Sequence, residues 1–98
     1  MEKKILQLAK EIYEKYNPKE IILFGSHARN TQNKHSDIDL LIVKKTNKKF
    51  NKRTEEVLNL VDCDLDLDIF VYTPEELSAM KKKGNYFIEK ALSEGVKI

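Results

Sequence analysis

The chain has 98 residues, 41% of them hydrophobic and 35% charged, with a formal net charge of +2. This length suits one domain with a modest core, so we expect a single domain over residues 1–98. No apolar run approaches the roughly 20 residues that cross a bilayer, and no leader-like apolar segment follows residues 1–4. The one cysteine, Cys63, excludes an internal disulfide. We therefore expect a cytoplasmic protein without a membrane partner.

An amphipathic helix is the first predicted element. Its apolar residues recur at helical spacing, and they are Ile5, Leu8, Ala9, Ile12, Tyr13 and Tyr16. Pro18 disfavours the helical conformation at the residue before it, so the helix should end at Asn17. Residues 20–24 are apolar and rich in isoleucine, which predicts a short first strand buried on both faces.

Gly25 and Ser26 predict a turn that can hold phosphate. Gly25 allows a tight turn because it has no Cβ, and Ser26 can cap the short helix that residues 27–29 would begin. Exposed amides and the positive end of a helix favour an anion, with the Ser26 hydroxyl and Arg29 as further donors. A Gly-Ser pair alone is more often a plain turn, so its significance depends on the acidic residues downstream.

Two aspartates, Asp37 and Asp39, open a second predicted strand over residues 37–44. Strand side chains alternate between faces, so both carboxylates project from the same side. At an intermediate effective dielectric, two carboxylates about 4 Å apart repel by a few kcal/mol. One of them must be protonated, or a cation must lie between them. His27 and His35 flank this pair without a cysteine or glutamate at ligand spacing, which favours ordinary surface residues.

A basic segment follows the second strand. It contains Lys44, Lys45, Lys48, Lys49, Lys52 and Arg53. The simpler interpretation is a solubilising loop and helix start, and the alternative is a basic rim that attracts nucleotide or nucleic acid. Nucleic acid is the weaker choice because the net charge is small and only Phe50 interleaves with the lysines. The apolar spacing from Phe50 to Val61 predicts a second substantial helix.

Residues 62–72 alternate strictly and predict a third strand. One face carries leucine, isoleucine and valine, and the other carries Asp64, Asp66 and Asp68 before two aromatic residues. An acidic edge facing water explains Asp64 adequately. If this strand pairs beside residues 37–43, one of the other aspartates joins Asp37 and Asp39. Three carboxylates suit Mg²⁺ or Mn²⁺, which bind carboxylates together with substrate phosphates.

The last part of the chain predicts two helices and a short strand. Thr73 should cap the first helix, with Pro74 at its first position and Glu76 completing a capping box. Gly84-Asn85 interrupts it, and a second apolar stripe then ends near Gly95. Residues 96–98 can form a last strand. The predicted fold class is therefore α/β, a small mixed sheet of three or four strands covered by helices.

Three segments together resemble the minimal nucleotidyltransferases of the DNA polymerase β superfamily. They are Gly-Ser-His-Ala-Arg at 25–29, Ser-Asp-Ile-Asp-Leu-Leu-Ile-Val at 36–43 and Leu-Asp-Ile-Phe-Val-Tyr-Thr-Pro-Glu-Glu-Leu at 67–77. The resemblance covers nearly the whole chain and implies a polymerase β-like nucleotidyltransferase fold. It implies that Gly25 and Ser26 hold the nucleotide, that Asp37 and Asp39 bind metal, and that Asp68 is the third carboxylate, with Asp66 as the fallback. Asn30 departs from the family pattern, because relatives usually have glycine there.

The resemblance also implies a reaction. Two Mg²⁺ ions, or Mn²⁺, at Asp37, Asp39 and Asp68 would bind ATP at its α-phosphate, and Asp68 would be the general base for the acceptor hydroxyl. Small stand-alone members resemble the antitoxins of toxin–antitoxin pairs, which transfer AMP to a tyrosine of a HEPN-type RNase toxin. The expected function is therefore protein adenylylation (AMPylation) by an antitoxin in a hetero-complex with such a toxin.

A non-catalytic function is the alternative. The domain could neutralise its partner simply by covering it, although the three intact carboxylates argue against this. The apolar stripe at Tyr86, Phe87, Ile88 and Leu92 is more apolar than packing on the sheet needs, so part of it is a candidate interface. Any exposed part of the Tyr13 and Tyr16 face is another candidate.

Overall fold

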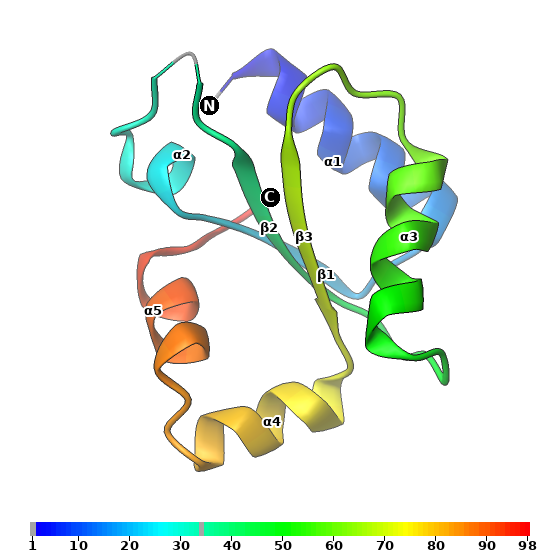
Figure 1. The fold of residues 1–98 in the computed structure, drawn as a ribbon, viewed down its shortest axis with the longest axis vertical. Helices are drawn as coiled ribbons and strands as arrows, with labels where there is room; N and C mark the ends of the chain where they lie inside the picture. The colour runs from blue at the N-terminus through cyan, green and yellow to red at the C-terminus, as the bar shows by residue number, and fades with distance from the viewer. Residues whose placement is uncertain (1, 34) are drawn as a thin grey trace.

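The structure, a computed structural model, describes residues 2–33 and 35–98 and contains a four-stranded mixed sheet with helices on both faces (Figure 1). In chain order its elements are α1 (Lys3–Tyr16), β1 (Glu20–Phe24), α2 (Ser26–Arg29), β2 (Ile38–Val43), α3 (Phe50–Leu60), β3 (Leu67–Tyr72), α4 (Pro74–Lys82), α5 (Tyr86–Glu94) and β4 (Val96–Lys97). The predicted α/β class with a small mixed sheet is confirmed. None of the helices in the described residues is both long and apolar enough to cross a bilayer.

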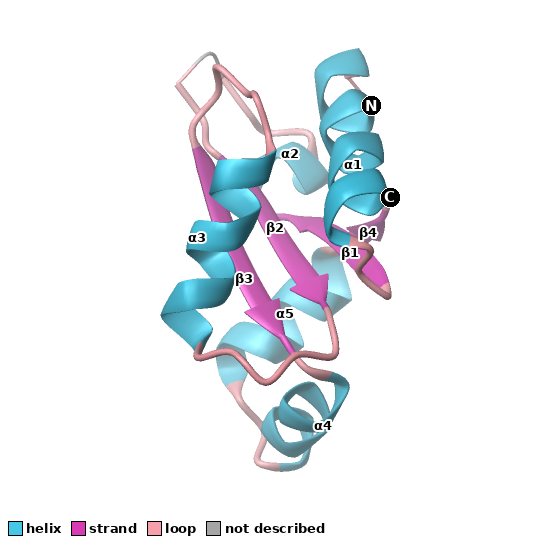
Figure 2. Ribbon diagram, turned by 90° about the vertical axis from the view of Figure 1, so that its right-hand side faces the viewer, coloured by secondary structure: helices cyan, strands magenta, loops and turns pink. Residues whose placement is uncertain are grey.

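The strands are ordered β3-β2-β1-β4. β1 pairs antiparallel with both β2 and β4, whereas β2 and β3 are parallel. Alternating side chains divide the core in two. Ile38, Leu40 and Ile42 of β2 pack with α1 and α3, while Leu41 and Val43 pack with α4 and α5. Figure 2 shows the two helical layers on opposite faces of the sheet.

The end of α1 confirms the predicted stop and narrows the proposed interface. Asn17 adopts the left-handed conformation, with φ 54°, and donates its backbone N–H to the Tyr13 carbonyl. The Tyr13 hydroxyl donates to the Ile98 carbonyl and accepts from the Ile21 N–H, both at 3.1 Å. Tyr16 is buried. Tyr16 therefore offers no surface for an interface, and Tyr13 is only partly exposed.

The third strand is shorter than its alternating sequence predicts. It begins at Leu67, because β2 begins only at Ile38 and residues 62–66 have no neighbouring strand to pair with. The last link before the ladder is the Ile38 N–H, which donates to the Asp66 carbonyl at 2.9 Å. Within the strand the alternation holds, since Ile69 packs in the α1 and α3 layer and Phe70 in the α4 and α5 layer.

Arg53 is a buried structural residue and not part of a basic rim. Its guanidinium forms a two-pronged ion pair with the Glu76 carboxylate at 2.6 and 3.2 Å. It also donates to the Lys48 and Val71 carbonyls at 2.7 and 3.1 Å. The Thr54 hydroxyl donates to the Ile69 carbonyl at 3.2 Å. These side chains of α3 therefore occupy carbonyls along the outer edge of β3, which would otherwise be open to a foreign strand.

The predicted capping box at α4 is present and is joined to this ion pair. The Thr73 hydroxyl accepts from the Glu76 N–H at 3.1 Å, and the Glu76 carboxylate accepts from the Thr73 N–H at 2.8 Å. The hydrogen-bonded Arg53 guanidinium is the main reason that the pKa of Glu76 is lowered. The predicted interruption is also found, because Gly84 has φ 70° and Asn85 caps α5 through the Ile88 N–H at 3.0 Å.

Replacing Arg53 should destabilise the fold. Arg53→Ala leaves two carbonyls and a half-buried carboxylate without their donor, and we expect a loss of about 2–4 kcal/mol in urea unfolding at pH 7. Part of this stability difference between the wild type and Arg53→Ala should disappear in acid. The folded pKa of Glu76 lies below its ordinary 4.5, so its contribution is present above 4.5 and is lost as the pH falls through the lowered value.

Lys52→Ala is the matched control. Lys52 is exposed and reaches Glu55 only at 3.4 Å, so its loss should change stability by less than about 0.5 kcal/mol. Equal effects of the two substitutions would show that the Arg53 contacts do not stabilise the fold.

Candidate active site

The end of β1 and the starts of β2 and β3 meet at one end of the sheet. β1 runs antiparallel to β2, and β2 runs parallel to β3, so the end of β1 lies beside the starts of β2 and β3. In this register Asp39 lies opposite Phe24 on one side and opposite Asp68 on the other. Asp39 is therefore the central side chain, with Gly25 following Phe24 on one side and the Asp68 carboxylate on the other.

The carboxylates predicted from the sequence affect one another. Burial is the main reason that the pKa of Asp39 is raised to about 6. The negative charge of Asp68 and a hydrogen bond with the Asp68 side chain raise it further. The charge of Asp37 adds to this shift, and His27 opposes it. Asp37 is more exposed and lies one residue before β2. Desolvation, followed by the charges of Asp68 and Asp66, raises its pKa as well. The structure thus brings Asp37, Asp39 and Asp68 together, and places Asp66 nearby but outside the β3 ladder.

Gly25 is required both by its conformation and by its neighbour. It has φ 75° and ψ −156°, a region that L side chains rarely adopt. A Cβ at this position would collide with the Asp39 carboxylate. The absence of a side chain at Gly25 therefore allows the turn to approach Asp39.

The turn differs in detail from the prediction. Gly25, and not Ser26, occupies the N-cap of α2, so the prediction that Ser26 caps this helix was wrong. The first amides of a helix have no intrahelical acceptor, which leaves the N–H groups of Ser26 and His27 oriented for an external one. Since α2 spans only Ser26–Arg29, its dipole contributes little. Asn30 ends it with φ 63°, a conformation that asparagine tolerates in place of the glycine that relatives usually have.

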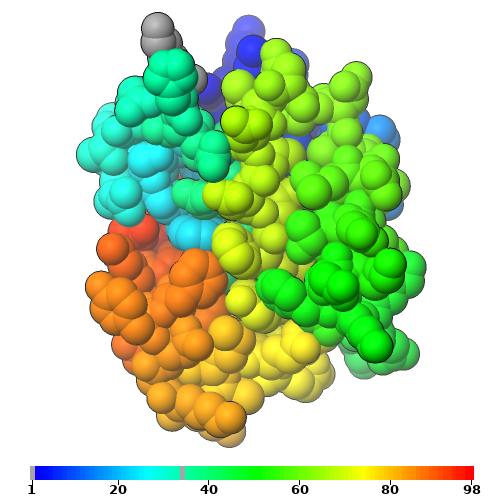
Figure 3. Space-filling view, viewed as in Figure 1, coloured from blue at the N-terminus to red at the C-terminus, as the bar shows by residue number. Residues whose placement is uncertain are grey.

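A pocket of about 410 Å³ adjoins the turn. Its lining comes from the end of β1, from α2, from Asp39 and from α5, and comprises Phe24, Gly25, Ser26, Arg29, Asp39, Tyr86, Phe87, Lys90, Ala91 and Glu94. Figure 3 shows the face on which α2 (cyan) and α5 (orange) approach each other beside β3. Arg29 stands at the end of α2 and donates to the Glu94 carboxylate at 2.9 Å. Arg29 lines the pocket, but its guanidinium is already ion-paired, and its role in nucleotide binding stays a prediction.

The α5 side of this pocket was missed by sequence analysis. Tyr86 and Phe87 were considered only for packing or an interface, and Lys90 and Glu94 were not considered. Tyr86, Lys90 and Glu94 follow one another at intervals of four residues, which places them along one face of α5. That spacing was the available signal, but it becomes informative only when α5 is known to lie beside the Gly25 turn.

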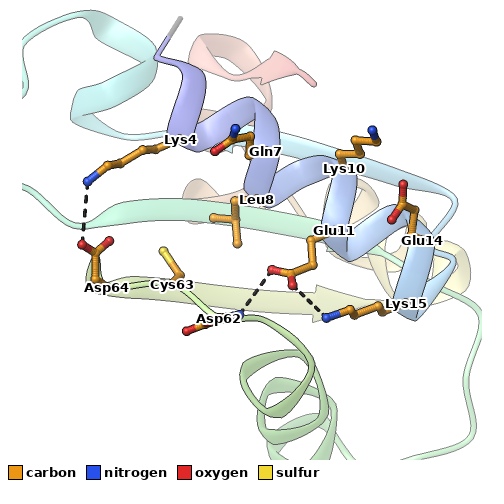
Figure 4. A pocket seen from close by; sticks show the side chains of 10 residues that line it. All are labelled: Lys4, Gln7, Leu8, Lys10, Glu11, Glu14, Lys15, Asp62, Cys63 and Asp64. Carbon is orange, nitrogen blue, oxygen red and sulfur yellow. Dashed lines mark hydrogen bonds and ion pairs between the residues drawn. The ribbon is translucent and has the colours of Figure 1, made fainter.

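A second and larger groove, about 590 Å³, lies elsewhere, between α1 and residues 62–64 (Figure 4). Glu11 accepts from Lys15 at 2.8 Å and from the Asp62 N–H at 3.2 Å, and Lys4 approaches Asp64 at 3.7 Å. These surface contacts connect α1 to the loop before β3. The groove includes none of the predicted site residues, so the smaller pocket beside Asp39 is the better candidate.

The carboxylates suit a hard cation by their chemistry. They provide only oxygen ligands, which Mg²⁺ and Mn²⁺ prefer. Burial first and mutual repulsion second raise the pKa values of Asp37 and Asp39, and a cation would relieve the repulsion. Over residues 2–33 and 35–98, however, no three His, Cys, Asp or Glu side chains are already arranged as a metal site. A cation would therefore have to draw these carboxylates closer together.

Comparison with known proteins identifies the family. Residues 3–98 match the family model described as a nucleotidyltransferase domain. The chain belongs to this family. A crystal structure of a putative nucleotidyltransferase from Sulfolobus solfataricus is similar to this nucleotidyltransferase domain with a TM-score of 0.58 and 29% identity, over 82% of this chain and 75% of that chain.

Two proteins of Methanocaldococcus jannaschii, each named a putative protein adenylyltransferase, are similar over shorter segments. One is 61% identical over 33 residues, which are 34% of this chain and 34% of the relative. The other is 54% identical over 41 residues, which are 41% of this chain and 42% of the relative. The matched segments thus span less than half the length of these relatives.

Neutralising Asp39 should stabilise the metal-free nucleotidyltransferase domain near pH 7. The folded pKa of Asp39, about 6, lies above its ordinary 3.8, so the wild type loses stability as the pH rises from about 4 to 6. Asp39→Asn avoids that loss. In urea unfolding with EDTA we expect a gain of about 1 kcal/mol at pH 7, after allowing for solvent screening, and none near pH 4.

Asp64→Asn provides the comparison, because Asp64 is exposed and lies 3.7 Å from Lys4. It should leave stability nearly unchanged across this pH range. A destabilised Asp39→Asn variant at pH 7 would contradict the view that the cluster is repulsive when no cation is bound.

Proposed function

We propose that this protein is a Mg²⁺-dependent adenylyltransferase that transfers AMP from ATP to a hydroxyl group of a partner protein. The observation that supports this most directly is the register that puts Asp39 between Asp68 and the Gly25 turn. Carboxylates for a cation and amides for phosphate then adjoin at one edge of the sheet. Membership of the nucleotidyltransferase domain family gives the reaction class.

Each residue has a distinct role in this proposal. Asp37, Asp39 and Asp68 would hold the metal, most simply two Mg²⁺ ions, with Mn²⁺ as a substitute. The bound metal neutralises phosphate charge and favours departure of pyrophosphate. The amides of Ser26 and His27 and the Ser26 hydroxyl donate to triphosphate oxygens, and Gly25 keeps the backbone close to Asp39.

The transfer conserves atoms and charge in one displacement. The acceptor hydroxyl gives its proton to the Asp68 carboxylate, and its oxygen forms a bond to the α-phosphorus of ATP. The bond from that phosphorus to the oxygen bridging to the β-phosphate breaks. Pyrophosphate leaves with the electron pair. Asp68 is suited to this role because it lies on the edge strand β3 and is exposed, so a hydroxyl carried by a large molecule can reach it.

A protein acceptor is supported by the names of the two relatives from Methanocaldococcus jannaschii. The resemblance to antitoxins of toxin–antitoxin pairs narrows the proposal to a tyrosine of a HEPN-type toxin, bound in a hetero-complex. The alternative is a non-catalytic module that masks its partner. The exposed Tyr86 and Phe87 would suit such a contact.

Mass spectrometry of a co-expressed HEPN-type toxin distinguishes these functions. With the wild-type protein we expect one or more adenylate increments on a toxin tyrosine, dependent on Mg²⁺. Asp37→Asn and Asp39→Asn should remove them because the metal loses a ligand, whereas Asp64→Asn should retain them. Silencing of the toxin by all variants, with no increment in any, would favour the masking module.

Substitutions in the turn test the phosphate site. Ser26→Ala removes one donor and should slow transfer by about 10- to 100-fold. Gly25→Val introduces a side chain that collides with Asp39, so we expect a larger loss, above about 100-fold. Transfer of labelled AMP, measured on variants shown by circular dichroism to be folded, makes the comparison. Full activity of Gly25→Val would place the phosphate site elsewhere.

A further inference from the structure

One wall of the pocket beside Asp39 comes from α5 and has no role in the reaction described above. Phe87 is held in place by other rings, since its centroid lies 5.6 Å from Phe24 and 5.1 Å from Phe70. Tyr86, the preceding residue, is 74% exposed although it lines the same pocket. Such an exposed aromatic ring beside a firmly packed one is available for a planar ligand.

The pocket lies on one side of the proposed reaction centre. Its lining includes Gly25, Ser26 and Asp39, but neither Asp37 nor Asp68. It is therefore on the side of the triphosphate, while the acceptor approaches from the side of Asp68. Its volume of about 410 Å³ falls within the range of small-molecule sites.

The charges in the pocket leave one cation free. Arg29 is paired with Glu94 at 2.9 Å. Lys90 is exposed, and within residues 2–33 and 35–98 no carboxylate lies within ion-pair distance of it. Because Tyr86 and Lys90 are four residues apart, they lie on the same face of α5. A ligand on this face meets an aromatic ring and an ammonium group one helical turn apart.

We propose that this face of α5 is the nucleoside triphosphate subsite, in which the Tyr86 ring stacks on the nucleobase and the Lys90 ammonium binds the triphosphate. This inference rests on the proposed nucleotidyl transfer and extends it to residues outside the family motifs. Stacking is available to every base, so Tyr86 contributes affinity with little selection among bases. The Arg29 guanidinium is already paired with Glu94, so the phosphate contact is assigned to Lys90.

Calorimetric titration can separate the two contacts. The probes are an ATP analogue with a methylene group between the α- and β-phosphates, which cannot be cleaved, and tripolyphosphate, which has no base, each with Mg²⁺. Tyr86→Ala should lower the affinity for the analogue by about 10-fold, the usual range for one stacked base. It should leave the affinity for tripolyphosphate unchanged. Tyr86→Phe should bind both as the wild type does. Lys90→Gln should lower the affinity for both probes by a similar factor, about 10-fold.

Lys82→Gln is the control for charge, since Lys82 is exposed on α4 and does not line the pocket. It should bind both probes nearly as the wild type does. Unchanged affinities in Tyr86→Ala and Lys90→Gln, with a wild type that binds the analogue, would overturn this inference and leave the proposed function intact. Slower transfer by Tyr86→Ala at unchanged affinity would assign the ring to the acceptor and would also overturn it. A wild type that binds neither probe would overturn the proposed function as well.

Discussion

The repulsion around Asp39 is the constraint on which the rest of the site depends. The strand register holds Asp39 opposite Asp68, and the Gly25 turn comes so close that no Cβ fits between. Asp68 is held in the ladder with β2, and Gly25 directly follows Phe24, the last residue of the ladder with β1. Burial, followed by the charge of Asp68, raises the pKa of Asp39 to about 6, and a cation bound at this place would relieve the repulsion.

The strand that carries Asp68, β3, is held along its outer edge by side chains of α3. Arg53 pairs with Glu76, which also completes the capping box of α4, and Arg53 and Thr54 occupy carbonyls on the outer edge of the strand. From Ile69 onward β3 is thereby fixed to α3 and, through Glu76, to α4. Asp68, the residue before Ile69, remains exposed on this edge strand. One edge strand can therefore be stable and still expose a carboxylate.

Local patterns in the sequence were sufficient for most of the elements and for the side-by-side placement of Asp37 and Asp39, whereas the choice of Asp68 came from the family resemblance. Helical spacing, the Asn17-Pro18 stop and the Thr73 capping box depend on residues close in sequence, and the Asp37 and Asp39 pair follows from the two-residue period of a strand. Apart from the N-cap of α2, which is Gly25 and not Ser26, the failures involved partners distant in sequence. The late start of β3 depends on where β2 begins, and the burial of Arg53 depends on Glu76, 23 residues away. The α5 wall depends on a packing contact with the Gly25 turn that no local pattern encodes.

The position of α5 also explains how two large ligands could share so small a domain. Asp39 belongs to both sides of the proposed reaction centre, because it lines the pocket with Gly25 and lies opposite Asp68 in the ladder. Tyr86 and Lys90 line the pocket side, and Asp68 lies outside it. The nucleotide and the acceptor would then contact different elements, α5 and β3, and meet only at the carboxylates. Binding of one need not displace the other, so a side chain on α5 can be altered without touching the acceptor side, whereas a change at Asp39 affects both.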